Sequence, residues 1–287
     1  MEERTAGMQE LDGYFPLYWD DRTGSLWLSV PRVGVDFLYA GGLAAGLGSN
    51  DIGLDRGQEG GGRIVRFERV GPRLMLVQGN QSFRSSSVNP AERKSVEDSF
   101  AKSILWGFTI EAESNGQVLV DATDFFLRDN LGAGNSLRPG AYRLDRTRSA
   151  FYMARTSAFL KNSEIEVTLT FTNEAGGGGR GGGGPSQGPT QIGVAGGGGG
   201  RGGLTSGTVA SVTPSPEAVT LREHFSFVEL PDDKFQVRAD DPRAGYTGLE
   251  YMDYSTPIGE PMVKPPHSNQ FWTKPGRRTF ATRPIRT

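Results

Sequence analysis

This chain of 287 residues lacks several features, and each absence excludes a class of site. It has no cysteine, which rules out disulfides and thiolate metal sites. Its two histidines, His224 and His267, are too far apart for the H-E-x-x-H motif, in which two histidines bind zinc from one helical face. No apolar run reaches the roughly 18 residues needed to span a bilayer. We expect no metal site, no cofactor and no membrane span in this chain.

Charge and the first residues bear on partners and location. A formal net charge of -2 gives no overall electrostatic reason to expect nucleic acid as a partner. Residues 1–7 place an acidic pair where a signal peptide would have basic residues before an apolar stretch. The chain as written is therefore expected to stay in the compartment where it is made, unless it is a fragment whose beginning lies upstream.

The sequence divides into three parts around a glycine-rich insert. We expect a lead-in over residues 1–10, a β-rich domain over 11–263, and a basic Pro/Arg-rich tail over 264–287 that is disordered or aberrant. Within the domain, residues 176–203 are mostly glycine and carry only Arg180 and Arg201 as charges, which predicts a mobile loop within an expanded hairpin. RNA binding by an Arg-Gly segment is disfavoured because aromatic residues are not interleaved.

The remaining pattern predicts a mainly β (α+β) fold of antiparallel, hairpin-rich sheets. Residues 14–19 and 25–30, 63–70 and 73–78, and 108–113 and 117–123 form three expected hairpins, the last around Asn115-Gly116, a strong turn signal. Further strands are expected at the following residues: 36–39, 150–153, 164–172, 208–212, 223–229 and 248–254.

One packed helix is expected near residues 90–106. Asn89 is a suitable N-cap, Pro90 suits the first helical position, and Glu92 completes a capping box. Three apolar residues then recur every four positions and would lie on a sheet: Val96, Phe100 and Ile104. Gly107 is expected to end the helix, after Trp106.

The loop from Gly46 to Gly62 is the main candidate binding site. It holds five polar residues among its glycines: Asn50, Asp51, Asp55, Arg56 and Gln58. These residues would bind a cation or a substrate, although the loop lacks the spacing of an EF-hand. The alternative is a glycine-permitted turn whose Asp and Asn side chains satisfy local backbone donors.

Other polar and aromatic residues have structural interpretations that we favour. Asp121 and Asp124 would face opposite ways on a strand, which favours turn formation and ion pairs with arginines over a general acid/base pair. His224 would share a strand face with Ser226, opposite two phenylalanines, as a hydrogen-bonded or solvent-facing residue. Four aromatic residues would either stack on a glycan or belong to the core, which we favour: Tyr14, Tyr18, Trp19 and Trp27.

Several long motifs resemble one protein family. Residues 11–20 (LDGYFPLYWD), 46–58 (GLGSNDIGLDRGQ) and 219–231 (VTLREHFSFVELP) are similar to the N-terminal region of bacterial zinc-dependent metalloproteases, and the resemblance runs from Thr5 to Val263. In that family this region has an uncharacterised role, follows a signal peptide and precedes a metzincin-like catalytic domain with H-E-x-x-H. The resemblance thus implies a secreted, periplasmic or extracellular protein, with zinc and the catalytic residues in a domain that is missing here.

Three hypotheses for the function follow from the sequence. The first is a non-catalytic companion of a metalloprotease catalytic domain, with a shielding, orienting or folding role and that domain as its partner. The second is a free-standing module that binds a peptide or a glycan, and the third is a hydrolase that uses carboxylates such as Asp51 or Asp121. Because the sequence after Lys264 resembles out-of-frame translation of GC-rich DNA, a truncated or frameshifted reading frame is a further hypothesis.

Overall fold

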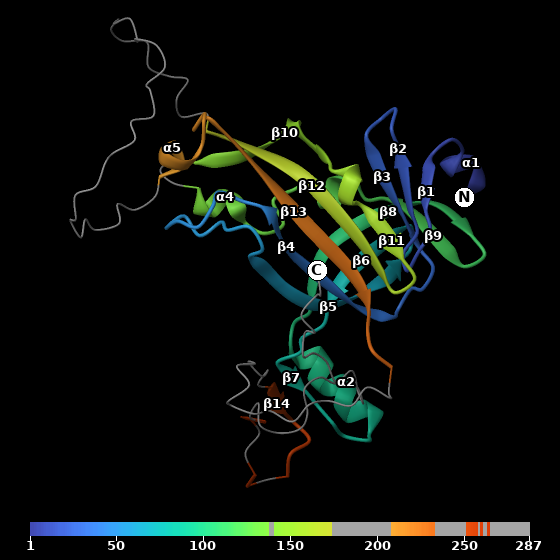
Figure 1. Cartoon of the computed structure of the whole chain (residues 1–287). Helices are drawn as coiled ribbons and strands as arrows, with labels where there is room; N and C mark the ends of the chain where they lie inside the picture. Colours follow the sequence, from blue (N-terminus) through green and yellow to red (C-terminus); the bar gives the residue numbers. More distant parts are fainter. Residues whose placement is uncertain (138–140, 174–207, 233–250, 258, 261–262, 265–287) are drawn as a thin grey trace, which may run out of the picture.

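The computed structural model describes residues 1–137, 141–173, 208–232, 251–257, 259–260 and 263–264, and these residues are mainly β (Figure 1). The helical elements are short: α1 (Glu2–Thr5), α2 (Pro90–Ser99), α3 (Thr123–Phe126), α4 (Ala133–Ser136), the 3-10 turn η1 (Met153–Arg155) and α5 (Val209–Val212). The strands are β1 (Gln9–Leu11), β2 (Leu17–Asp20), β3 (Ser25–Val30), β4 (Asp36–Ala45), β5 (Glu59–Val70), β6 (Arg73–Gln78), β7 (Phe83–Arg84), β8 (Ser103–Ser114), β9 (Gln117–Asp121), β10 (Tyr142–Phe151), β11 (Ser157–Phe159), β12 (Asn162–Asn173), β13 (Ala218–Glu229), β14 (Tyr251–Asp253) and β15 (Val263–Lys264).

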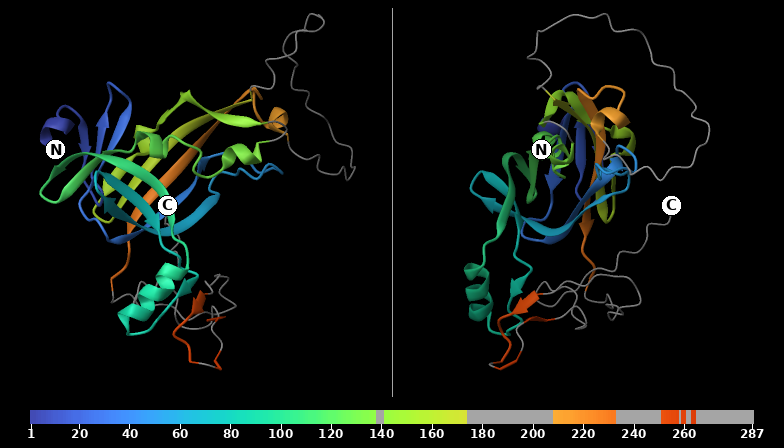
Figure 2. Two further views of the ribbon diagram at one scale, coloured as in Figure 1. Left: turned by 180° about the vertical axis from the view of Figure 1, so that it is seen from behind. Right: turned by 90° about the vertical axis from the view of Figure 1, so that its left-hand side faces the viewer.

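Twelve strands form one antiparallel sheet that curls on itself (Figure 2). The strand order is β1-β2-β3-β9-β8-β6-β5-β4-β13-β12-β10, and β11 pairs with the free half of β12. The two ends of the sheet approach each other, since the rings of Trp19 in β2 and Phe151 in β10 have centroids 5.7 Å apart. The backbone N–H of Tyr14 also donates to the carbonyl of Phe159, at 2.7 Å. The curl gives the sheet an inner face, which holds the core, and an outer face.

Aromatic side chains fill the inner face. Phe225 and Phe227 alternate along β13 with residues of the outer face, as the period of a strand requires, and neither is exposed to solvent. The short helix α3 adds Phe125 and Phe126, whose rings lie 6.4 Å and 5.7 Å from that of Phe227. Burial of these large side chains supplies much of the free energy of folding. The alternation sends Glu164 and Glu166 of β12, and Arg222 and His224 of β13, to the outer face together, whereas Glu223 lies on the inner face.

The three hairpins expected from the sequence are confirmed. β2 pairs with β3, β5 with β6, and β8 with β9, each in antiparallel register. Asn115 and Gly116 connect β8 to β9 with φ angles of 52° and 79°. Both central residues of the turn are therefore left-handed, which is why the Asn-Gly pair suits this position. The mainly β, antiparallel fold class is likewise confirmed.

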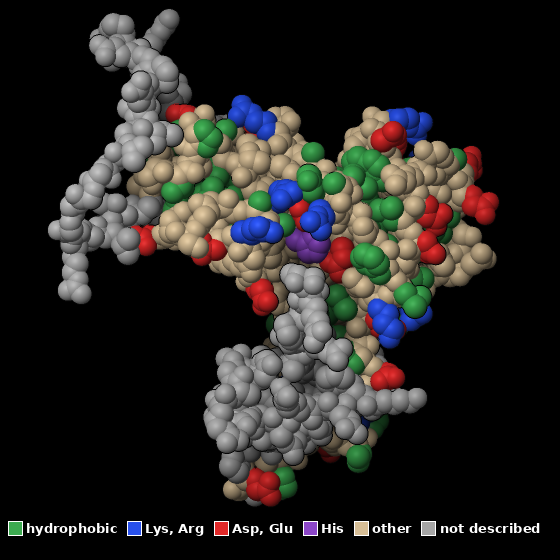
Figure 3. Space-filling view, viewed as in Figure 1, with side chains coloured by type: hydrophobic (Ala, Val, Ile, Leu, Met, Phe, Trp, Pro, Cys, Tyr) green, Lys and Arg blue, Asp and Glu red, His purple; other side chains and the backbone are tan. Residues whose placement is uncertain are grey.

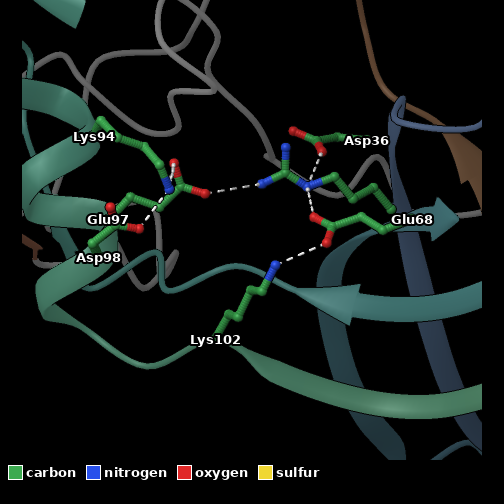
Figure 4. Close-up of polar contacts among 7 residues, drawn as sticks. Asp36, Glu68, Lys94, Glu97, Asp98 and Lys102 are labelled. Atoms are coloured by element: carbon green, nitrogen blue, oxygen red, sulfur yellow. Dashed lines mark hydrogen bonds and ion pairs between the residues drawn. The ribbon is translucent and has the colours of Figure 1, made fainter. Parts of the chain in front are cut away.

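A small lobe lies beside the curled sheet (Figures 1 and 2). In it β14 pairs with β7 in parallel and with β15 in antiparallel register, and α2 packs against β7. Figure 4 shows the ion pair that joins this lobe to the sheet, together with the charged residues around it. Arg66 of β5 lies 3.9 Å from Glu97 of α2 and 3.2 Å from Glu68 of its own strand.

The expected helix over residues 90–106 is wrong in its second half. The N-cap is confirmed, because the side chain of Asn89 accepts from the backbone N–H of Ala91. The helix ends at Ser99, however, and Phe100 is extended and stacks on Phe83 with ring centroids 4.1 Å apart. Ser103 begins β8, which pairs with β6, and no residue of α2 is buried. The apolar residues at positions 100 and 104 thus serve the lobe and a strand instead of one helical stripe.

Three other expectations need correction or lie outside the described residues. Residues 209–212 form α5 and no strand, and Thr208 caps this helix in a capping box with Ser211. Residues 150–153 divide between the end of β10 and η1. The insert at 176–203, the tail from residue 265 and residues 248–250 lie outside the described part, although the insert does connect antiparallel neighbours, β12 and β13.

Candidate functional site

The outer face of the sheet is hollowed by a trough of about 550 Å³ that crosses β12 and β13. Its floor consists of Glu164 and Glu166 from β12 and Arg222 and His224 from β13. Glu166 and His224 are direct cross-strand partners, which brings the four side chains together. Figure 3 shows this face, with Lys and Arg side chains in blue around the described histidine in purple. We call this hollow the outer trough.

Two backbone segments form the walls of the outer trough. Arg155 and Phe159 stand on one wall, which η1 and β11 build, and Tyr152 anchors this wall to β12 by donating its N–H to the carbonyl of Glu166 at 2.7 Å. Arg56 stands on the other wall, in the loop between β4 and β5. Leu43 of β4 holds this loop, since its carbonyl accepts from the N–H of Gly57 at 2.7 Å.

His224 lies between two carboxylates. Its Nε2 is 2.7 Å from Glu164 Oε2, and its Nδ1 is 3.4 Å from Glu166 Oε2. The hydrogen bond with Glu164 raises the pKa of His224 above its ordinary value, with a smaller contribution from Glu166 and against the effect of partial burial. Only the protonated ring donates from both nitrogens, so the floor stabilises an imidazolium.

Glu164 is held ionised by its neighbours. Burial opposes ionisation, but hydrogen bonds from His224, Ser226 and Asn162 outweigh it and keep the pKa of Glu164 below its ordinary value. The amide of Asn162 donates at 2.5 Å, and the hydroxyl of Ser226 donates as well. The site therefore contains a fixed Glu-His-Glu cluster of alternating charge.

This cluster is poorly suited to general-base chemistry. A general base must face its substrate with a free nitrogen lone pair. Both ring nitrogens of His224 face carboxylates, so the ring orients Glu164 and Glu166 instead. The arrangement fixes the positions of both carboxylates.

The arginines give the outer trough its remaining charge. Arg222 Nη1 lies 3.3 Å from Glu166 Oε1, and its guanidinium group stacks on Tyr152, 4.3 Å from the ring centroid. Arg56 and Arg155 are exposed, and neither forms an ion pair with an acidic side chain among the described residues. Two unpaired cations thus face the trough from opposite walls, which favours an anionic ligand.

The floor also contains a buried carboxylate oxygen that has no hydrogen bond. The side chain of Glu166 is only 6% exposed, and its Oε1 has no hydrogen bond within the described residues, since the ion pair with Arg222 lacks hydrogen-bond geometry. Buried carboxylate oxygens normally have a donor. This oxygen is enclosed by the protein, and Arg222 is its ion partner.

Of the five residues predicted as a binding loop, the structure brings one into the outer trough, Arg56. Asn50 serves the turn, as in the alternative interpretation: its amide donates to the carbonyl of Leu47 at 2.8 Å, and its Oδ1 accepts from the N–H of Ile52 at 3.0 Å. Asp51 is exposed, and Asp55 accepts the backbone N–H of Gln58 at its carbonyl. A binding role for the loop as a whole stays a prediction.

The other carboxylates considered from the sequence are engaged locally. Asp121 accepts the backbone N–H of Thr123 at 2.8 Å, and Asp124 forms an ion pair with Arg146 at 2.6 Å. These are the turn and the ion pair that we favoured. Within the described residues, no group of three or more His, Cys, Asp or Glu is placed to hold a metal ion. Nor is any described helix long and apolar enough to cross a membrane.

The four aromatic residues considered as a glycan platform each have a partner within the chain. Trp19 packs on Phe151, and Tyr14 lies 4.6 Å from Phe15 between ring centroids. The other two contacts are polar: the hydroxyl of Tyr18 donates to Glu10, and Arg4 lies over the ring of Trp27.

Sequence reasoning missed most of the trough. It placed His224 on the face of Ser226, which is confirmed, but it did not single out Glu164, Glu166 or Arg222. A signal was present, because the alternation of residues 164–172 sends both glutamates to one face. Only the cross-strand register brings them to His224.

A protein-family model described as "Domain of unknown function (DUF5117)" matches residues 57–264. No curated protein and no solved structure matches the chain. The matched residues include the floor of the outer trough and the wall that η1 and β11 build. On the other wall, Arg56 and the residues of β4 lie outside the match.

Proposed function

The chain belongs to the family of domains of unknown function called DUF5117, and we propose that it is a non-catalytic binding domain whose outer trough holds a carboxylate group of a polypeptide. The observation that carries this proposal is the pair of unpaired arginines, Arg56 and Arg155, on opposite walls of the trough. A carboxylate between two guanidinium groups accepts charge-assisted hydrogen bonds from both, and these are the strongest that side chains make.

The electrostatics of the floor support an anionic ligand. Glu164 and Glu166 are offset by His224, whose pKa is raised, and by Arg222. Arg56 and Arg155 then leave an excess of positive charge. A fixed, already paired floor costs little reorganisation when a ligand binds.

The resemblance to the front region of zinc-dependent metalloproteases suggests whose polypeptide is bound. In that setting the domain is a companion of the catalytic domain, with a shielding, orienting or folding role, and the trough holds a polypeptide that the catalytic domain handles. Zinc and the catalytic residues belong to that other domain. The hydrolase hypothesis is less well supported, because Asp121 is engaged in a turn and Asp124 in an ion pair.

Loss of both wall arginines is expected to abolish carboxylate binding. The probe is a fluorescein-labelled ten-residue peptide of alternating glycine and glutamate, and the readout is fluorescence anisotropy. Each charge-assisted hydrogen bond contributes about 1.5–3 kcal/mol, so Arg56→Ala with Arg155→Ala is expected to raise Kd by at least about 100-fold. Raising the salt concentration is expected to weaken binding to the unmodified chain.

The matched control removes two exposed arginines elsewhere on the sheet, Arg73 and Arg143. It changes net charge by the same amount and is expected to leave Kd within about twofold, apart from general screening. Equal weakening by both double variants, or no binding to the unmodified chain at millimolar peptide, would contradict the proposed function.

A further inference from the structure

Six side chains give the outer trough its charge, and one of them can change its charge near neutral pH. The six are Arg56, Arg155, Glu164, Glu166, Arg222 and His224. Arginine stays protonated in proteins, whereas imidazole is the side-chain group whose ordinary pKa lies between pH 5 and pH 8. His224 is therefore the group through which a change of pH near neutrality acts on the trough.

His224 lies where a bound anion would meet its charge. It stands in the floor between Glu164 and Glu166, and its side chain is 34% exposed, so that water can exchange its proton. A protonated ring sets four cations against two carboxylates, a formal net charge of +2, and a neutral ring sets three cations against the same two. Loss of one proton thus halves the positive charge of the trough.

The contacts of the ring show where the lost charge would be felt. Nε2 lies 2.7 Å from Glu164 and Nδ1 lies 3.4 Å from Glu166, so a neutral ring would keep its hydrogen on Nε2, at the shorter contact. The lone pair on Nδ1 would then face Glu166, whose remaining cation among the described residues is Arg222. Because the side chain of Glu166 is enclosed, water would screen this imbalance poorly.

The other elements around His224 offer no carboxylate to the trough. On β4 its cross-strand partner is Gly42, and the β4 residues that line the trough are apolar: Leu43 and Ala44. On η1 and β11 the charged residue of the trough wall is Arg155. Glu223 precedes His224 in β13 but lies on the inner face. Within the described residues, the carboxylates that favour the protonated ring thus come from β12.

From this arrangement we infer that carboxylate binding in the outer trough is coupled to protonation of His224, an inference that rests on the proposed function and adds the regulation of that site. The protonated trough binds its anionic ligand more tightly, and the bound ligand in turn favours the protonated ring, because coupling between two bound species is reciprocal. The hydrogen bond with Glu164 raises the pKa of His224 above its ordinary 6.5. Affinity is therefore highest below pH 6.5 and falls as the pH rises through the pKa of the folded state.

The first test measures peptide affinity at pH 6 and at pH 9. The probe is the ten-residue peptide of alternating glycine and glutamate without its label, and the readout is isothermal titration calorimetry with the full chain at constant ionic strength. The carboxylates of the peptide are ionised at both pH values. We expect Kd to be about tenfold higher at pH 9, since one positive charge of a partly enclosed site is lost.

Three variants locate the proton. His224→Gln cannot be protonated, so its Kd at pH 6 is expected to be about tenfold higher than that of the unmodified chain, and equal to its own Kd at pH 9 within about twofold. The matched control is His267→Gln, which removes the other histidine of the sequence and should keep the tenfold dependence. Glu223→Gln should also keep it, which excludes Glu223, whose pKa is about 8.

Proton uptake provides a readout on the unmodified chain. At pH 8, calorimetry in two buffers with different ionisation enthalpies measures how many protons each bound peptide takes up. We expect measurable uptake by the unmodified chain and by His267→Gln, and none by His224→Gln. If His224→Gln fails to fold, the unmodified chain still decides, because binding without uptake would overturn the coupling.

The outcomes separate this inference from the proposed function. Equal affinity at pH 6 and pH 9, with Arg56 and Arg155 still required, overturns the coupling and leaves carboxylate binding in place. A pH dependence that persists in His224→Gln also overturns it, because the proton then binds elsewhere. If the peptide binds at neither pH, the proposed function and the coupling both fall.

Discussion

Replacing Glu223 with glutamine is expected to flatten the pH dependence of folding stability between about pH 5 and pH 8. Glu223 lies on the inner face of β13 and is fully buried. Neither of its carboxylate oxygens has a hydrogen bond among the described residues, although the N–H groups of Asn130 and Leu131 face it and partly favour the charge. Burial, together with the negative charge of Asp129, raises the pKa of Glu223 to about 8.

The sign of the effect follows from proton binding. In the unfolded chain Glu223 loses its proton near its ordinary pKa of 4.5, whereas the folded chain retains it up to about pH 8. Between these values the folded state binds more protons, so the free energy of unfolding falls as the pH rises. At about 1.4 kcal/mol per unit, the loss amounts to about 3–5 kcal/mol by pH 8. Glutamine resembles the protonated acid and removes this term.

Chemical denaturation at several pH values measures this effect. The control is Glu217→Gln, at an exposed residue just before β13, which is expected to leave the curve unchanged. In Glu223→Gln the free energy of unfolding is still expected to decline slightly with pH, because the pKa of His224 is raised in the folded state. The stability that His224 contributes is fully present below pH 6.5 and is lost as the pH rises through the pKa of the folded state. The same slope in Glu223→Gln and in the unmodified chain would mean that Glu223 is charged at neutral pH.

Truncating Phe227 to alanine is expected to lower the free energy of unfolding by about 3–5 kcal/mol. Phe227 is fully buried at the centre of the inner face. Its ring lies 5.2 Å from that of Phe37 on β4 and 5.7 Å from that of Phe126 on α3, measured between centroids. Because strands and a helix meet around it, the cavity left by truncation would close poorly.

The matched control makes the same change at an exposed ring. Phe159 is 53% exposed, so Phe159→Ala is expected to change the free energy of unfolding by less than about 1 kcal/mol. Denaturant midpoints at constant m-value compare the two variants. Similar losses for both would contradict the placement of Phe227 in the core.

Local signals predicted the hairpins well, because their turns are specified by adjacent residues. Asn115 and Gly116 adopt the left-handed conformation that few other residues tolerate. The end of α2 was not predictable in the same way. Phe100 and Ile104 continue the helical period, but stacking on Phe83 and pairing of β8 with β6 override it. Both partners are contributed by segments outside the helix.

The site was harder to predict than the fold. Alternation alone places Glu166 and His224 on outward faces, but their pairing depends on the register of β12 and β13 across a long connection. Arg155 enters the trough through η1, a single turn without a distinctive motif. Arg56 was predicted as one of five polar residues in a binding loop. Of these five only Arg56 lines the trough, whereas Asn50 serves a turn.

The most direct test of the central claim, that the outer trough holds a polypeptide carboxylate, is a crystal structure of the chain with Gly-Gly-Gly-Leu. We predict that the peptide carboxylate lies between the guanidinium groups of Arg56 and Arg155. A second hollow of about 340 Å³ lies between α2 and the sheet, lined by Arg66 and Lys102 among others. A peptide bound only there, with the outer trough empty, would contradict the claim.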